Sequence, residues 1–119
     1  MYKKENIVYV PMVADYIHHG HINIIEKAKE YGYVIVGLMT DKAAASYKRL
    51  PLLNFDQRLN IVKNIKGVDE VLPQNEFDYV PNIRKYKPNF FIHGSDWKTG
   101  VQKKARERVI EEMKLLNGQ

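Results

Sequence analysis

The sequence predicts one α/β domain, a doubly wound parallel sheet with helices on both faces. Two patterns along the chain support this fold class. Apolar runs of strand length alternate with segments of helical periodicity. The strand-like runs are continuously apolar rather than alternating, which is typical of parallel strands buried on both faces. A length of 119 residues corresponds to a single domain at 1–119, and 45% hydrophobic residues suffice for its core.

The individual elements follow from local patterns. Strands are predicted at 6–12, 33–39, 68–72 and 89–93. Helices are predicted at 19–31, 41–46, 55–65, 78–86 and 100–116. Thr40 and Asn54 are expected to cap two of these helices, and Gly32 and Gly67 to end two. With a strand order of 3-2-1-4, the order reverses between the first and fourth strands, where doubly wound sheets bind their ligands.

Composition narrows the possible functions. The chain has no cysteine, which excludes disulfides and thiolate metal sites. No apolar stretch approaches the roughly 20 residues of a membrane span, and the first residues lack the pattern of a signal peptide. We therefore expect a cytoplasmic protein without membrane contact. The net charge of +5 and the pI near 9.3 favour an anionic ligand, either a nucleotide or a nucleic acid. Ordinary surface charge explains the same values equally well.

The turn between the first strand and the first helix is the main candidate site. Its polar residues are Asp15, His18, Gly20 and His21. The first amides of a helix lack internal partners, and the helix dipole adds partial positive charge there. Gly20 lets backbone approach a ligand, while His18 and His21 add side-chain N–H donors. These residues predict a phosphate-binding turn.

The segment Asp15–His21 resembles the His-x-Gly-His signature of a nucleotidyltransferase superfamily. Three further matches follow in order: Thr40-Asp41-Lys42, Asp56-Gln57-Arg58 and Gly94-Ser95-Asp96-Trp97. The similarity covers about residues 6–116 and is strongest to the cytidylyltransferases. The run Thr40–Pro51 is similar to the cytidylyltransferase segment joined to phosphoenolpyruvate phosphomutase in phosphonate pathways. The glycerol-3-phosphate cytidylyltransferases come next.

The resemblance implies a Rossmann-like form of the predicted fold and a transfer of CMP from CTP. A phosphate or phosphonate oxygen of the acceptor attacks the α-phosphorus of CTP and releases pyrophosphate, with 2-aminoethylphosphonate as the favoured acceptor. A phosphate oxygen with a second pKa of about 6 is largely ionised at neutral pH, so no general base is required. Mg²⁺ is expected to arrive with the nucleotide rather than in a protein metal site. Asp15 either accepts backbone N–H bonds that hold the turn or helps to hold that ion.

The resemblance also assigns roles to individual residues. The catalytic residues are His18 and His21, which donate to the triphosphate, and Lys48, which screens the repulsion between the acceptor and the α-phosphate. Arg49 is the second candidate for the role of Lys48, and Lys42 is a weaker one. The nucleotide-binding positions are Val13, Ala14, Asp15, Gly20, Arg58, Gly94, Asp96 and Trp97.

Several of these residues have competing interpretations. Arg58 reaches the nucleotide, a neighbouring loop or a surface ion partner. Asp96 can accept from the cytosine amino group, and Trp97 is either a stacking wall or a core residue. His93 is expected to be packed, and His19 to be exposed.

The sequence departs from the family pattern at two places. Met12-Val13-Ala14 stands where relatives have Gly-Thr-Phe, so Met12 narrows the room beside the nucleotide. The C-terminal Ile-Ser-Ser/Thr-Thr signature is not found. We therefore expect the chain to be truncated before that signature, with the last strand missing, as part of a longer multidomain protein. A homodimer is expected because relatives are commonly dimers.

Two other functions compete with CTP-dependent transfer. One is an adenylyltransferase of the same superfamily that uses ATP. The other is a nucleotide-binding module that is inactive in this truncated form. A nucleic-acid binder would use the basic residues of the last helix, Lys103, Lys104, Arg106 and Arg108. These residues alternate with apolar ones, so an ordinary solvated helix face is the favoured interpretation and no nucleic acid is expected.

Overall fold

The computed structural model describes residues 6–46, 50–76, 78–93 and 103–115, with the side chains of the last segment from residue 106 onward. Its centre is a parallel four-stranded sheet with the order β3-β2-β1-β4, as predicted. The strands are β1 (Ile7–Met12), β2 (Tyr33–Met39), β3 (Glu70–Gln74) and β4 (Phe90–Phe91).

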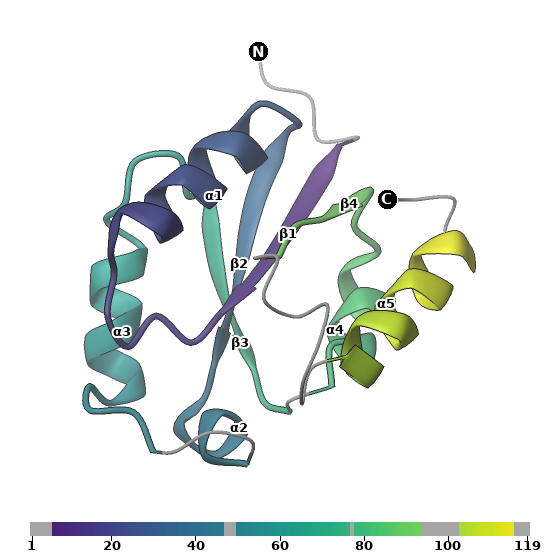
Figure 1. The fold of residues 1–119 in the computed structure, drawn as a ribbon. Helices are drawn as coiled ribbons and strands as arrows, with labels where there is room; N and C mark the ends of the chain where they lie inside the picture. The colour runs from purple at the N-terminus through teal and green to yellow at the C-terminus, as the bar shows by residue number, and fades with distance from the viewer. Residues whose placement is uncertain (1–5, 47–49, 77, 94–102, 116–119) are drawn as a thin grey trace.

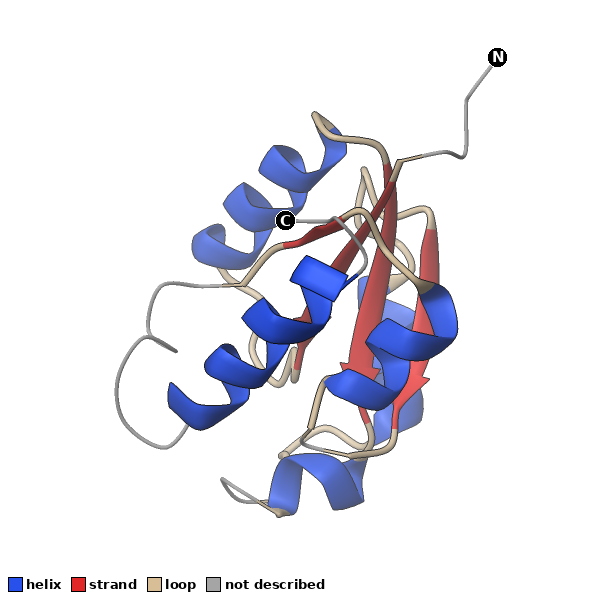
Figure 2. Cartoon of the chain, turned by 90° about the vertical axis from the view of Figure 1, so that its right-hand side faces the viewer, coloured by secondary structure: helices blue, strands red, loops and turns tan. Residues whose placement is uncertain are grey.

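Helices cover both faces of this sheet (Figure 1). They are α1 (His19–Lys29), α2 (Asp41–Ala45), α3 (Phe55–Val62), α4 (Val80–Tyr86) and α5 (Lys103–Leu115). One face carries α1 and α3, and α4 and α5 lie together in front of the other face (Figure 2). The short helix α2 lies at the carboxyl ends of the strands, directly after β2. Among the described residues, no helix is long and apolar enough to cross a membrane.

Two hydrophobic clusters form the core, one on each face. Successive side chains of a strand point to opposite faces of a sheet. In β1, Val8 and Val10 accordingly pack with Ile25 of α1 and Val62 of α3. On the other face, Ile83 of α4 packs with residues of α5 and α2, namely Val109, Met113, Ala43 and Ala44. The buried positions Val109 and Met113 show that α5 is amphipathic, as its sequence predicted.

A buried polar network crosses the second face. The Tyr9 hydroxyl donates to Gln74 Oε1 at 2.7 Å and accepts from Asn82 Nδ2 at 2.7 Å, which joins β1, β3 and α4. Burial raises the pKa of Tyr9 well above its ordinary value. The hydroxyl lies over Gly37 of β2, where an added Cβ would come within 1.9 Å of it. Gly37 is therefore required for the packing of Tyr9.

The third strand is the main error in the predicted elements. It was expected at 68–72 with Pro73 as its end, but β3 runs from Glu70 to Gln74 and includes Pro73. Proline lacks an N–H and is tolerated in edge strands. The sheet order places β3 at an edge, so it pairs on one side with β2. The fourth strand is also shorter than expected, with two residues in β4.

Candidate functional site

The turn that follows β1 places His18 at the N-cap of α1. The His18 backbone is extended (φ −139°, ψ −177°), and its Nδ1 accepts the Gly20 amide at 3.0 Å. His21 completes a reciprocal cap, because its Nδ1 accepts the His18 amide at 3.2 Å. The two ring centroids are 4.3 Å apart. Capping boxes usually pair serine or threonine with glutamate or glutamine, and two imidazoles have that role here.

The reciprocal cap determines which ring nitrogen can donate to a ligand. A nitrogen that accepts a backbone N–H carries no proton, so each neutral imidazole carries its proton on Nε2. The His18 side chain is exposed, so its Nε2–H can reach a ligand at the start of α1. Binding of the anion by the helix amides stays a prediction. The Gly20 amide is already bonded to His18, so the imidazole is the better-placed donor.

Gly20 gives room to the cap itself. An added Cβ at residue 20 would lie 2.8 Å from His18 Cε1 and 3.1 Å from His18 Nδ1. The sequence suggested that this glycine lets backbone approach a ligand, but the group nearest to it in the structure is the imidazole that caps the helix. A contact between Gly20 and the nucleotide stays a prediction.

Asp15 connects the turn to the chain that precedes α3. Its Oδ2 accepts the Leu52 amide and its Oδ1 accepts the Leu53 amide, each at 3.1 Å. Of the two predicted roles, the structure shows the one that uses backbone N–H groups. Those groups lie 37 and 38 residues further along the chain rather than in the turn of Asp15 itself. A part in holding Mg²⁺ stays a prediction.

Arg58, on α3, is fully buried with 0% of its surface exposed. Its Nη1 donates to the carbonyls of Val13 and Met39, both at 2.7 Å, and its Nε donates to the Leu53 carbonyl at 3.0 Å. Its Nη2 donates to Asp41 Oδ1 at 2.6 Å. The surface ion pair considered from the sequence is therefore wrong, because the guanidinium is buried. The neighbouring-loop contact is observed, and contact with the nucleotide stays a prediction.

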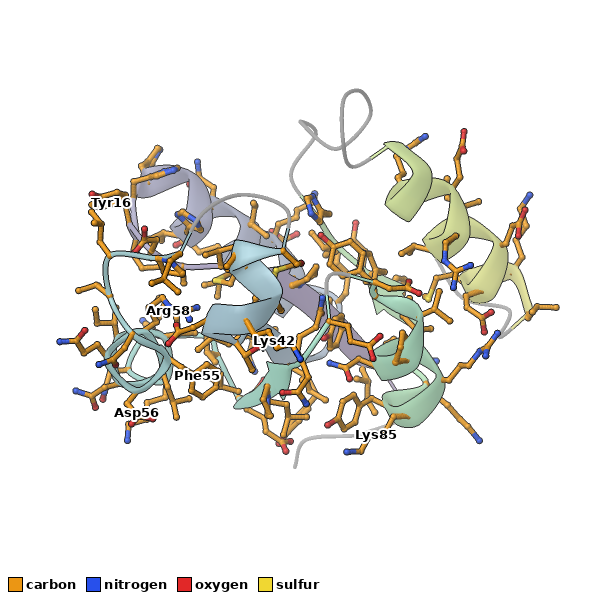
Figure 3. The ribbon with its side chains drawn as sticks, turned by 90° about the horizontal axis from the view of Figure 1, so that it is seen from below. Tyr16, Lys42, Phe55, Asp56, Arg58 and Lys85 are labelled. Atoms are coloured by element: carbon orange, nitrogen blue, oxygen red, sulfur yellow. The ribbon has the colours of Figure 1, made fainter. Side chains whose placement is uncertain are left out.

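Figure 3 views the molecule from the side of the strand carboxyl ends. Arg58 lies toward α2, whereas Asp56 and Tyr16 lie at the periphery. Lys42 is exposed on α2 at this end of the sheet. The sequence did not single out Asp41 as the partner of Arg58. An acidic residue in the first turn of a helix is explained by the helix dipole alone, so no local signal indicated the ion pair.

Val13 and Ala14 link β1 to Asp15 and shape the turn. Ala14 is 2% exposed and has φ of 59°, in the left-handed region that costs a residue with a Cβ about 1 kcal/mol. Such a conformation persists where neighbouring contacts hold the backbone, and the hydrogen bond between Val13 and Arg58 is one of them. Nucleotide contacts at Val13 and Ala14 stay predictions.

Four predicted site residues, Lys48, Gly94, Asp96 and Trp97, lie outside the described residues, as does Arg49. His93 is packed, as expected. Its Nε2 lies 3.2 Å from the Tyr79 hydroxyl, and its ring meets the Tyr79 ring edge-on at 5.8 Å.

In the part of the chain that the structure describes, no group of three or more His, Cys, Asp or Glu residues could hold a metal ion. Both carboxylate oxygens of Asp15 accept backbone amides. A Mg²⁺ ion held by triphosphate oxygens needs no such cluster, and its participation stays a prediction.

Residues 13–118 match a family model described as cytidylyltransferase-like. The chain is 34% identical over 86 residues to a glycerol-3-phosphate cytidylyltransferase of Bacillus spizizenii, covering 71% of this chain and 67% of that one. It is 36% identical over 84 residues to an ethanolamine-phosphate cytidylyltransferase of Mus musculus, covering 69% of this chain and 21% of that one. It is also 35% identical over 104 residues to an FAD synthase of Methanothermus fervidus, covering 82% of this chain and 72% of that one.

A solved structure has the same fold. The lipopolysaccharide core biosynthesis protein from Thermoplasma volcanium GSS1 superposes with a TM-score of 0.79, covering 95% of this chain and 89% of that one. The sequence identity in this comparison is 23%, so the likeness concerns the fold alone.

Proposed function

The chain belongs to the cytidylyltransferase-like family of nucleotidyltransferases, and from this premise we propose that it transfers CMP from CTP to a small acceptor that carries a phosphate or phosphonate group. The observation that carries this proposal is the reciprocal imidazole cap at the start of α1. It supports a triphosphate site because it holds two rings with their protons on Nε2 at the positive end of a helix dipole.

In the proposed reaction an ionised acceptor oxygen attacks the α-phosphorus of CTP. A new P–O bond forms, the bond to the bridging oxygen between the α- and β-phosphates breaks, and its electrons leave with pyrophosphate. The acceptor oxygen needs no base because a phosphate second pKa is about 6. The protein has to orient two anions and stabilise charge on the leaving group. His18 and His21 serve as Nε2–H donors to the triphosphate, and Mg²⁺ carried by the nucleotide would offset further charge.

The names of the relatives favour a phosphate monoester as the acceptor. The mouse relative acts on ethanolamine phosphate and the Bacillus relative on glycerol 3-phosphate, according to their names. The phosphonate alternative depends on the resemblance of residues 40–51. We therefore propose an acceptor with a small organic group and a terminal phosphate or phosphonate. A homodimer and a longer parent chain stay predictions.

An adenylyltransferase is the second candidate. The FAD synthases among the relatives support it, and one of them covers 82% of this chain. The choice of base would depend on groups near Asp96 and Trp97, which lie outside the described residues. The alternative therefore shares the triphosphate turn and differs in the nucleotide and the acceptor.

A binding assay and an activity assay test these proposals on the 119-residue chain. At a hundred times its Kd, a nucleotide stabilises a protein by about 2.7 kcal/mol, which raises the melting temperature on the order of 10 °C. CTP with Mg²⁺ should give this shift. Pyrophosphate release should then depend on glycerol 3-phosphate, phosphoethanolamine or 2-aminoethylphosphonate. ATP-dependent release with FMN would favour the second candidate, and a chain stabilised by neither nucleotide would contradict both.

A further inference from the structure

Asp15 and Arg58 are the centre of a contact network at the carboxyl ends of the strands, which we name the Asp15–Arg58 clasp. It consists of the side chains of Asp15, Arg58 and Asp41 and the backbone groups of Val13, Met39, Leu52 and Leu53. The network joins parts of the chain that are up to 45 residues apart.

Leu53 is the point where the two halves of the clasp meet. Its amide donates to Asp15 Oδ1 at 3.1 Å, and its carbonyl accepts Arg58 Nε at 3.0 Å. Arg58 also binds the Val13 carbonyl, two residues before Asp15. The contacts therefore close a ring through Val13, Asp15, Leu53 and Arg58. This ring fixes the backbone three residues before His18, the first residue of the imidazole cap.

The clasp also holds the chain on both sides of residues 47–49. Asp41, on α2, precedes that segment and binds Arg58 at 2.6 Å. Leu52 and Leu53 follow it and bind Asp15. The Met39 carbonyl, at the end of β2, accepts a further Arg58 hydrogen bond at 2.7 Å. Both flanks of the segment are thus tied to the turn that leads to His18.

Four of the five N–H groups of the Arg58 guanidinium donate to protein oxygens. Its Nε, Nη1 and Nη2 atoms all donate to described protein oxygens, and the side chain is 0% exposed. A nucleotide could reach the guanidinium only if the protein groups that bury it moved away, which is costly for a buried and paired charge. Asp15 likewise uses both carboxylate oxygens on amides. These contacts suit residues that hold other groups in place.

We propose that Asp15 and Arg58 are positioning residues of the nucleotidyl transfer. They set residues 52–53 and the ends of β1 and β2 against the His18–His21 turn, and this role replaces the nucleotide contacts predicted for them from the sequence. This inference depends on the proposed function for its reaction, but the clasp itself does not.

The variant Asp15→Asn tests the proposal, with Asp69→Asn as its matched control. An asparagine at residue 15 has one carboxamide oxygen for two amides, so one hydrogen bond is lost. Asp69 also accepts a backbone amide, that of Val34 at 2.8 Å, and it binds Lys29 at 2.6 Å. It lies before β3, at the opposite end of the sheet. Both variants remove one carboxylate charge from a residue that accepts a backbone amide, but only Asp15 belongs to the clasp.

A positioning role predicts a specific split of the kinetic constants. Displacement of about 1 Å in a reacting geometry can cost a hundredfold in rate. We expect Asp15→Asn to lower kcat by about tenfold to a hundredfold, while its Kd for CTP stays within about twofold of the wild-type value. Asp69→Asn should change neither kcat nor this Kd. Arg58→Lys, which keeps the charge but not the planar fork, should show the same split if it folds. A parallel loss of CTP affinity, or an unchanged kcat in Asp15→Asn, would overturn the proposal.

If the wild-type chain transfers no nucleotide, the proposed function is contradicted, but the clasp is not. A spectroscopic measurement then tests the clasp without the reaction. In Asp15→Asn, the imidazole ¹⁵N resonances of His18 and His21 should shift together with the amide resonances of Leu52 and Leu53. Asp69→Asn should move none of them. Changes confined to Leu52 and Leu53 would show that the clasp does not position the turn, and the proposal would be rejected.

Discussion

The capping role and the ligand role of His18 can be separated by one substitution. In His18→Asn the Oδ1 atom is bonded to Cγ, as Nδ1 is in histidine, so it can accept the Gly20 amide. Asparagine is among the most favourable N-cap residues. It has no counterpart of Nε2, so the predicted donor to the triphosphate is lost. His18→Ala removes both the cap and the donor.

The cap is a single hydrogen bond of 3.0 Å to the Gly20 amide, and replacing a capping side chain with alanine typically costs about 1 kcal/mol. For a chain of this size that lowers the melting temperature by roughly 3–6 °C. His18→Asn should stay within about 0.5 kcal/mol of wild type. A hydrogen bond to a charged group contributes about 1.5–3 kcal/mol, so both variants should bind CTP roughly 10- to 150-fold more weakly.

Urea unfolding measures the stability of each variant, and titration calorimetry with CTP and Mg²⁺ measures its affinity. His19→Asn is the matched control, because His19 is exposed next to the cap and should change neither quantity. If His18→Asn binds CTP as tightly as wild type, Nε2 does not contact the nucleotide and the proposed site is wrong. If His18→Ala is as stable as wild type, the imidazole cap does not hold the helix. A double alanine variant at His18 and His21 would not distinguish these outcomes, because it removes both halves of the cap.

Three further predictions concern stability. Arg58→Met should lower the free energy of unfolding by about 3–5 kcal/mol in denaturant titrations, because it leaves buried acceptors without their donor; a loss below about 1 kcal/mol would contradict the burial. Gly37→Ala should cost about 1–3 kcal/mol, because the new Cβ falls 1.9 Å from the Tyr9 hydroxyl; an unchanged melting temperature would show that the strands have room. The hydrogen bond from Arg84 lowers the pKa of Glu112 below its ordinary value of 4.5. This contact therefore stabilises the folded protein above pH 4.5, and its contribution is lost as the pH falls through the lowered pKa. Glu112→Gln should therefore melt earlier than wild type at neutral pH, and the difference should vanish in acid.

Local sequence signals were sufficient for most of the secondary structure. The strand at 33–39 and the helix start at His19 were predicted at their observed positions, and the Thr40 and Asn54 side chains cap α2 and α3 as expected. These features depend on residues within a few positions of one another, so periodicity and capping rules are enough to locate them. The continuous apolar runs also indicated a parallel sheet, and the topology followed its predicted order.

The same local rules located the imidazole turn but not its internal bonding. The spacing of His18, Gly20 and His21 indicated a donor-rich helix start. It did not show that each ring caps the helix, because a histidine can present either nitrogen and the choice depends on the folded backbone. The extent of β3 was missed for a related reason. Pro73 ends a central strand but is tolerated at an edge, and only the sheet order shows which case applies.

The sequence by itself determined the fold class and the order of elements, and it predicts the segment where a phosphate would bind, because each of these depends on neighbouring residues. Only the tertiary structure decided the roles of Asp15 and Arg58. Apart from the Leu53 carbonyl, five residues before Arg58, their partners lie between 17 and 45 residues away, among them Asp41 and Val13 for Arg58 and Leu53 for Asp15. A carboxylate can accept from any donor, and a guanidinium can donate to any acceptor, that folding brings within about 3 Å. The partner of either group therefore cannot be known before the chain is packed.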